Sequence, residues 1–94
     1  MAIASEGESE DSEISTRAGR APFYLIFEDG ELVEKWKNPF SRGGGGAGWS
    51  VAYKMHEKDV GKLFAGRFGG NMKQALEEKG IDYEEGEGKV KDFK

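Results

Sequence analysis

PFYLIFEDGELVEKWK, residues 22–37, is the most strongly patterned segment of the chain. Its first part, residues 22–27, is an unbroken run of apolar side chains, typical of a strand covered on both faces. Residues 28–30 (EDG) are a tight-turn signal, and residues 31–37 supply the hairpin partner. The Asn-Pro pair at 38–39 ends that partner, since proline cannot donate to a strand ladder. The segment therefore predicts a β-hairpin whose first strand lies inside a sheet.

Shorter patterns on both sides of the hairpin predict further elements. Residues 2–4 (AIA) indicate a short buried strand, and residues 6–16 an acidic loop without the spacing of a calcium loop. Residues 48–58 have the spacing of a helix with a broad apolar stripe. The expected members of that stripe are Trp49, Val51, Ala52, Tyr53 and Met55. Residues 62–66 (KLFAG) predict another buried strand.

The last elements are a second helix and an edge strand. Asn71 is a good N-cap residue, and Lys79 with Gly80 suits the other end of the helix. The buried face of this helix is expected to contain Met72, Ala75 and Leu76. Residues 81–85 (IDYEE) alternate, as in a strand with one solvated face. The order β-β-β-α-β-α-β implies a mixed sheet, antiparallel on one side and parallel on the other.

Right-handed crossovers place both expected helices on one face of this sheet. The other face also needs a cover, because residues 22–27 are apolar on both sides. Val90 and Phe93 in the short tail, 86–94, are spaced as on one helical turn. We expect them to fold back over that face, a second copy of the chain or a partner protein being the alternative.

The composition excludes several classes of function. The chain has 94 residues, 36% hydrophobic and 34% charged, as expected for a single soluble domain, 1–94. Its net charge of −4 argues against nucleic acid as a partner. The absence of cysteine excludes disulfides, thiolate-bound zinc, a Cys nucleophile and any cluster held by the chain's own thiolates. With no signal peptide and no apolar run long enough to span a membrane, a cytoplasmic protein without membrane contact is expected.

The glycine-rich run 43–48 (GGGGAG) precedes the first expected helix. It satisfies the start of a P-loop pattern, but Trp49 occupies the position of the essential lysine, and no Rossmann unit follows. Two interpretations stay open: a flexible linker, or backbone N–H groups arranged for an anion at a helix start. The segment 66–71 (GRFGGN) has the same form. Both are expected at the carboxyl ends of parallel strands, where open α/β sheets bind ligands.

Several motifs together make the chain similar to the dinitrogenase iron–molybdenum cofactor biosynthesis family, of NifX/NifB type. The matching positions are Ser15, Gly19, Arg20, Ala21, Phe23 and Tyr24 before and within the first hairpin strand, Asn38 and Pro39 after the hairpin, Gly45, Gly46 and Gly48 at the first helix, and Gly69, Asn71, Leu76, Gly80 and Ile81 around the second. Arg17 stands where the family has a histidine, and Gly70 where it has a proline. The resemblance covers nearly the whole chain.

The resemblance implies a ribonuclease-H-like fold, a five-stranded mixed sheet with two main helices and here a shortened C-terminal segment. It also implies a non-catalytic carrier of an iron–sulfur or iron–molybdenum-type cluster. Arginines near helix starts suit such an anion, or another small anion, better than a bare metal ion. The expected cofactor-binding residues are Ser15, Arg17, Gly19, Arg20, Arg42, Gly45, Gly46, Gly48, Arg67, Gly69 and Asn71, with no catalytic residue and no direct metal ligand.

The alternative function is a protein-interaction module of the same fold that binds no cofactor. A nuclease is a more distant third, because no carboxylate cluster suited to two metal ions stands out in the sequence. A monomer or a weak dimer is expected.

Overall fold

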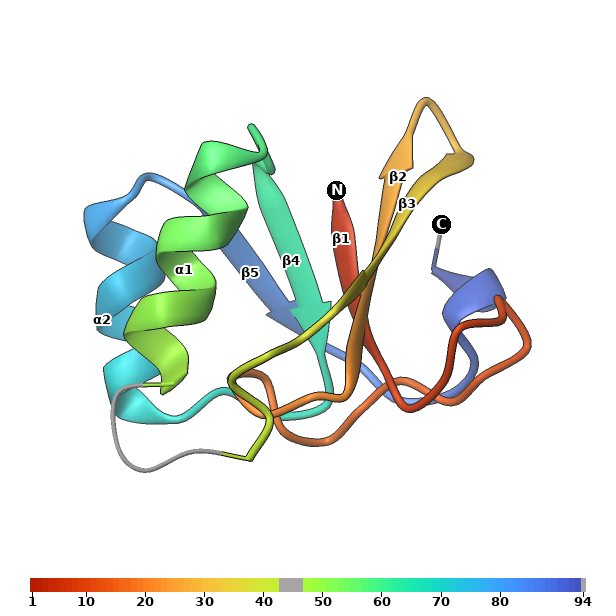
Figure 1. Ribbon diagram of the computed structural model, residues 1–94, viewed down its shortest axis with the longest axis horizontal. Coiled ribbons are helices and arrows are strands. Elements are labelled where there is room, and N and C mark those ends of the chain that lie inside the picture. Colours follow the sequence, from red (N-terminus) through yellow and green to blue (C-terminus); the bar gives the residue numbers. More distant parts are fainter. Residues whose placement is uncertain (43–46, 94) are drawn as a thin grey trace.

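The computed structural model describes residues 1–42 and 47–93. Their elements follow the predicted order (Figure 1). They are strands β1 (Ala2–Ser5), β2 (Phe23–Glu28) and β3 (Glu31–Lys37), helix α1 (Ala47–Glu57), strand β4 (Lys62–Ala65), helix α2 (Gly70–Glu78), strand β5 (Asp82–Glu85) and the 3₁₀ helix η1 (Val90–Asp92). Within the described ranges, no helix has the length and apolar character needed to cross a membrane.

The strands form one five-stranded mixed sheet in the order β3-β2-β1-β4-β5. β1 pairs antiparallel with β2 and parallel with β4, while β2–β3 is antiparallel and β4–β5 parallel. The predicted mixed sheet is therefore confirmed, with β5 at one edge as expected.

The β2–β3 hairpin confirms the pattern of residues 22–37. Asp29 and Gly30 in its turn both have positive φ, 52° and 82°, as a type I′ turn requires. A register shift after Ile26 then places Leu32 opposite Phe27. Both faces of β2 are covered, because its buried side chains alternate between two apolar clusters.

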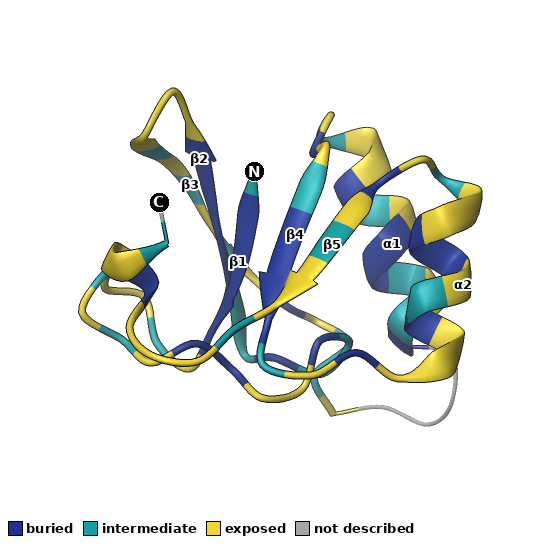
Figure 2. Cartoon of the chain, turned by 180° about the vertical axis from the view of Figure 1, so that it is seen from behind, coloured by how far each residue is buried: buried dark blue, intermediate teal, exposed yellow. Residues whose placement is uncertain are grey.

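The first cluster lies between the sheet and the two helices, which cover the same face as predicted (Figure 1). The helices contribute Val51, Ala52, Met55, Met72, Ala75 and Leu76, and the strands Ala2, Ala4, Tyr24, Ile26, Leu63 and Ala65. In Figure 2, buried stretches (dark blue) lie on β1, β2 and β4 and on parts of both helices. Burial raises the pKa of the Tyr24 phenol far above its usual range, so this hydroxyl stays neutral.

Two predicted details of the helices are wrong. Trp49 and Tyr53 are 38% and 52% exposed, because the buried stripe of α1 runs along Ala47, Val51, Ala52 and Met55. Asn71 does not cap α2: the helix begins at Gly70, its N-cap is Gly69, and no side chain caps it. A cap is worth only about 1 kcal/mol, so the burial of Met72 in the first turn outweighs it.

The second cluster covers the opposite face of the sheet. There Ile3, Leu25, Phe27 and Phe64 meet Ile14 and the fully buried Val90, and Phe93 packs at the margin with its ring 5.9 Å from that of Phe64. The prediction that Val90 and Phe93 fold back over this face is therefore confirmed.

The tail is attached to the acidic loop that follows β1. The backbone N–H groups of Val90 and Lys91 donate to the carbonyls of Ser12 and Glu10, both at 2.9 Å. The Lys91 ammonium also lies 3.0 Å from the Asp11 carboxylate, and this hydrogen bond holds the pKa of Asp11 below its usual value. The ion pair therefore supports the attachment above the ordinary carboxyl pKa and is lost in acid. Both groups are exposed, so the backbone bonds matter more.

Candidate functional site

The candidate site lies at the edge of the sheet where the parallel strands end. β1, β3, β4 and β5 point the same way, so the segments that follow them gather at one end of the molecule, the lower end in Figure 1. This is the end at which open α/β sheets place their ligands. Of the two glycine-rich segments, 66–71 follows β4 at this end as expected, whereas residues 43–46 lie outside the described residues.

A pocket of about 410 Å³ opens among these segments. Its lining comes from residues 16–20, from 47–49 at the start of α1, and from 67 and 69–72 at the start of α2. We call it the loop pocket. Three segments that are far apart in the sequence are thus brought to a single concave surface.

Most of the predicted site residues line the loop pocket, and the other predicted residues do not. Arg17, Gly19, Arg20, Gly48, Arg67, Gly69 and Asn71 line it. Arg42 lies in an adjoining hollow that shares Arg17 and Arg20. Ser15 is fully buried beneath the lining segment, where its hydroxyl accepts a hydrogen bond from the Arg17 N–H at 3.3 Å. Gly45 and Gly46 lie outside the described residues.

Two lining residues, Trp49 and Met72, were expected on the buried apolar faces of the helices and not at the site. Met72 is buried and contributes to both, whereas Trp49 is partly exposed at the pocket rim. One signal for Trp49 was present in the sequence. It directly follows Gly48 at a helix start, a position where a side chain borders any ligand bound by the loop.

Asn38 holds the first lining segment in place, a role that the sequence analysis did not assign to it. Its side-chain amide donates to the carbonyls of Gly19 and Ala21, at 3.1 and 2.9 Å, and accepts from the Phe40 N–H at 2.9 Å. Its own N–H donates to the Pro22 carbonyl. Asn38 is 2% exposed, and its bond to the Ala21 carbonyl is fully buried, while the bonds to Gly19 and Phe40 are half-buried. The end of β3 is thereby fixed to the segment that carries the pocket arginines.

Two glycines allow the three lining segments to approach closely. A Cβ on Gly19 would lie 3.1 Å from the Gly48 nitrogen, and a Cβ on Gly48 would lie 3.2 Å from Cα of Met72. Directly after β4, a Cβ on Gly66 would lie 2.8 Å from Cα of Thr16, a contact that side chains do not make without a backbone shift. Glycine is needed for space at position 66, whereas at 19 and 48 a side chain would require its neighbour to shift by a few tenths of an ångström.

Gly66→Ala is expected to lower the free energy of unfolding by about 1–3 kcal/mol, because the added methyl meets the backbone of Thr16 and that segment must move. Urea unfolding measures the change. Gly61→Ala is the matched control, since nothing lies within 4 Å of a Cβ at that position, just before the same strand. Equal effects of the two substitutions would show that close packing at Gly66 is not the cause.

The described charged residues that line the loop pocket are all positive. Arg17, Arg20 and Arg67 provide positive charge, and no Asp or Glu is among its described lining residues. The first turn of α2 adds backbone N–H groups that have no partner within the helix and receive no side-chain cap. In the described part of the chain, no group of three or more His, Asp or Glu side chains could hold a metal ion. The pocket therefore suits an anionic ligand and not a bare cation.

The family of the chain follows from comparison with known proteins. Residues 1–93 match the family described as dinitrogenase iron–molybdenum cofactor. The chain belongs to this family. The match spans the whole sheet, both helices and η1, which confirms the resemblance inferred from the sequence motifs. Members of the family are accessory and carrier-type domains of iron–molybdenum cofactor biosynthesis.

Solved structures support the same assignment. The apo form of the orange protein from Desulfovibrio gigas is 27% identical, with a TM-score of 0.87 over 97% of this chain and 79% of that one. A NifB-type Thermotoga protein, TM1290, is 28% identical, with a TM-score of 0.81 and the same coverage. PH0822 shares the fold, with a TM-score of 0.75 at 18% identity over 97% of this chain and 82% of that one. Among curated protein sequences, no match was found.

Proposed function

We propose that the chain is a non-catalytic carrier that holds an anionic metal–sulfur cofactor, or a precursor of one, in the loop pocket. The observation that supports this most is the concentration of Arg17, Arg20 and Arg67 around one pocket in a protein with a net charge of −4. The proposed ligands are an iron–sulfur or iron–molybdenum-type cluster. We also propose that the fold is of the ribonuclease-H-like class and that residues 1–94 form a single domain.

The donor set suits noncovalent binding of such a ligand. With no cysteine, the chain cannot hold a cluster through thiolates. A cluster with terminal sulfides or oxides instead presents acceptors to guanidinium groups and to the N–H groups at a helix start. Trp49 and Met72 add apolar surface that would fit the soft sulfide face of the ligand.

We propose that other predicted site residues shape the pocket and do not pair with the charge of the ligand. Ser15 orders the backbone of Arg17, and Gly19, Gly48 and Gly69 keep the pocket open to its ligand. Asn71 borders the mouth from the first turn of α2. Gly45 and Gly46 stay in the proposal as predicted site residues, and they lie outside the described residues. The carrier role requires binding and release only.

Anaerobic titration with tetrathiomolybdate, a soluble molybdenum–sulfur dianion, tests the proposal. Visible absorption should show saturable binding, and amide chemical shifts should change at residues 16–20, 47–49 and 67–72. Sulfate should bind much more weakly, because it lacks the soft sulfides that Trp49 and Met72 would contact. Shifts confined to other surfaces would contradict the proposal.

The double variant Arg17→Gln with Arg67→Gln is expected to weaken tetrathiomolybdate binding at least about tenfold, because it removes two charge-assisted contacts. The double variant Lys35→Gln with Lys37→Gln is the control, since it removes the same charge from two exposed residues of β3 that do not line the pocket. An equal loss in both proteins would indicate a general charge effect in place of a site.

A protein-interaction module without a cofactor is the second candidate. Trp49 and Tyr53, one turn apart on α1 and both partly exposed, favour it, since such side chains often anchor protein interfaces. This second function would be supported if tetrathiomolybdate changed neither the absorption nor the amide chemical shifts, and if the shifts of α1 changed only when a protein was added.

A further inference from the structure

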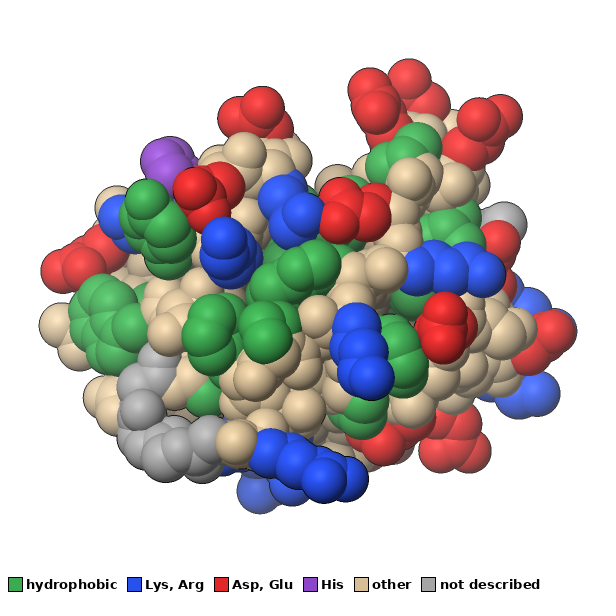
Figure 3. Space-filling view, viewed as in Figure 1, with side chains coloured by type: hydrophobic (Ala, Val, Ile, Leu, Met, Phe, Trp, Pro, Cys, Tyr) green, Lys and Arg blue, Asp and Glu red, His purple; other side chains and the backbone are tan. Residues whose placement is uncertain are grey.

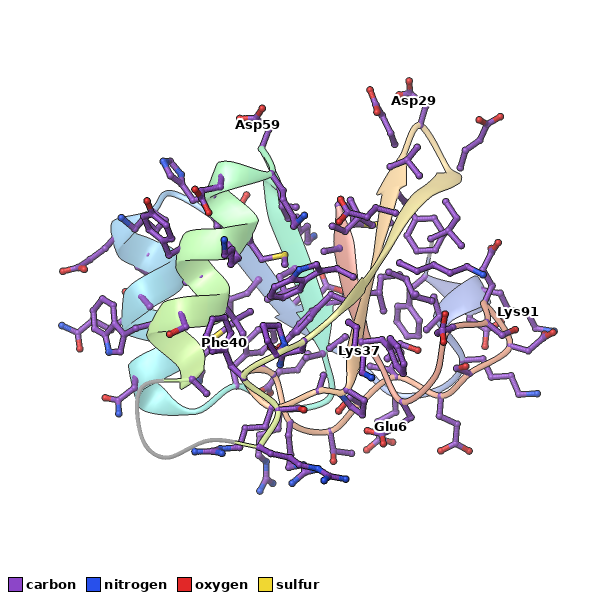
Figure 4. The ribbon with its side chains drawn as sticks, viewed as in Figure 1. Glu6, Asp29, Lys37, Phe40, Asp59 and Lys91 are labelled. Atoms are coloured by element: carbon purple, nitrogen blue, oxygen red, sulfur yellow. The ribbon has the colours of Figure 1, made fainter. Side chains whose placement is uncertain are left out.

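A second hollow of about 630 Å³ adjoins the loop pocket. Four cationic side chains line it: Arg17, Arg20, Lys37 and Arg42. Its other described lining residues are apolar or uncharged, and none is an Asp or Glu. We call these four residues the basic patch. In Figure 3, Lys and Arg side chains gather at the lower edge of the molecule, and Figure 4 shows Lys37 on β3 above them.

The fold builds this patch from three separate segments. Lys37 is the last residue of β3 and pairs with Phe23, the first residue of β2. The next residue, Asn38, is bonded to the carbonyls of Gly19 and Ala21. The segment with Arg17 and Arg20 therefore lies beside the one with Arg42. The gathering of positive charge follows from the same buried asparagine that positions the loop pocket.

The patch contrasts with the charge of the rest of the protein. Because the whole chain has a net charge of −4, the residues outside the four-cation patch carry −8. Among the described residues, the ion pairs join other lysines to carboxylates and do not involve Lys37, Arg17 or Arg42. A positive patch on a protein of negative net charge attracts and orients an acidic partner.

We propose that the basic patch is the docking surface for an acidic segment of the protein that delivers or receives the ligand. This inference rests on the carrier role proposed above. Arg17 and Arg20 line both the patch and the loop pocket, so a partner seated on the patch reaches the pocket mouth. Its carboxylates compete with the ligand for the same two guanidinium groups. Docking thereby weakens the hold on the ligand at the moment of transfer.

An acidic peptide, fluorescein-labelled decaglutamate, is the probe. Anisotropy at low ionic strength gives its Kd, and amide shifts locate it at residues 17–20 and 37–42. Lys37→Glu and Arg42→Glu should each weaken binding at least about threefold. Lys35→Glu is the matched control: it makes the same charge change two residues earlier on the same face of β3, outside the patch. It should change the Kd by less than about twofold, and added salt should weaken binding to every variant that binds.

Equal losses with Lys35→Glu and Lys37→Glu would overturn the proposal, because only net charge would then matter. Tighter binding of a single-stranded oligonucleotide, with the same dependence on Lys37, would overturn it in favour of nucleic acid. Tetrathiomolybdate binding to Lys37→Glu separates the two proposals, since Lys37 does not line the loop pocket and the Kd should stay within about twofold. If tetrathiomolybdate fails to bind wild type while decaglutamate shows the Lys37 dependence, the carrier role fails and the docking surface stands.

Discussion

Replacing Asn38 by alanine is expected to lower the free energy of unfolding by about 2–4 kcal/mol, because it leaves one buried and two half-buried polar groups without partners. The carbonyls of Gly19 and Ala21 lose their donor, and the Phe40 N–H loses its acceptor. The segment bearing Arg17 and Arg20 loses its attachment to the end of β3. Urea unfolding should show the change in stability, and tetrathiomolybdate affinity should fall with it.

Asn71→Ala is the matched control for this asparagine. Asn71 is exposed in the first turn of α2, whose N-terminus receives no side-chain cap. Its removal should change stability by less than about 0.5 kcal/mol, as is usual for surface positions. A loss for Asn71→Ala as large as that for Asn38→Ala would mean that the buried hydrogen bonds do not explain the result.

Deleting residues 87–94 is expected to lower the free energy of unfolding by about 2–4 kcal/mol. The deletion removes Val90, which is fully buried, and Phe93, which packs on Phe64, and so uncovers the second face of the sheet. The uncovered surface should also promote self-association. Urea unfolding and the mass in solution measure both effects. A monomer of unchanged stability would show that the tail is not the cover.

A point substitution keeps this test informative if the shortened chain fails to fold. Val90→Ala should cost about 1–2 kcal/mol, since it leaves a cavity in the second cluster. Val33→Ala is its control, because Val33 is 55% exposed on β3. The same methyl groups are removed in both variants, and only burial differs. Equal effects would contradict the account of the second face.

The sequence predicted the elements of the fold well where the pattern was local. The run at 22–27 and the Glu-Asp-Gly turn specify a hairpin by themselves, since both depend on neighbouring residues. The predicted burial of Trp49 and Tyr53 was wrong because it depends on long-range contacts. A helix with apolar residues on several sides can present more than one stripe to a sheet, and contacts with α2 and the strands select which one is buried.

At the candidate site, too, local features could be predicted from the sequence and long-range features could not. Arginines and glycines beside expected helix starts were predicted, and the structure brings Arg17, Arg20 and Arg67 around one pocket. The burial of Ser15 and the anchoring role of Asn38 were not predicted. Both depend on how residues 15–21 lie against β1 and β3, which is a long-range property of the fold.

Anomalous X-ray scattering at the molybdenum edge, from crystals of the protein grown with tetrathiomolybdate, tests the carrier role most directly. We expect one strong difference peak inside the loop pocket, within reach of the Arg17 and Arg67 guanidinium groups and the first turn of α2. Crystals of the Arg17→Gln, Arg67→Gln variant should lack it. A peak on another surface, or none from crystals of protein saturated with the dianion in solution, would contradict the account.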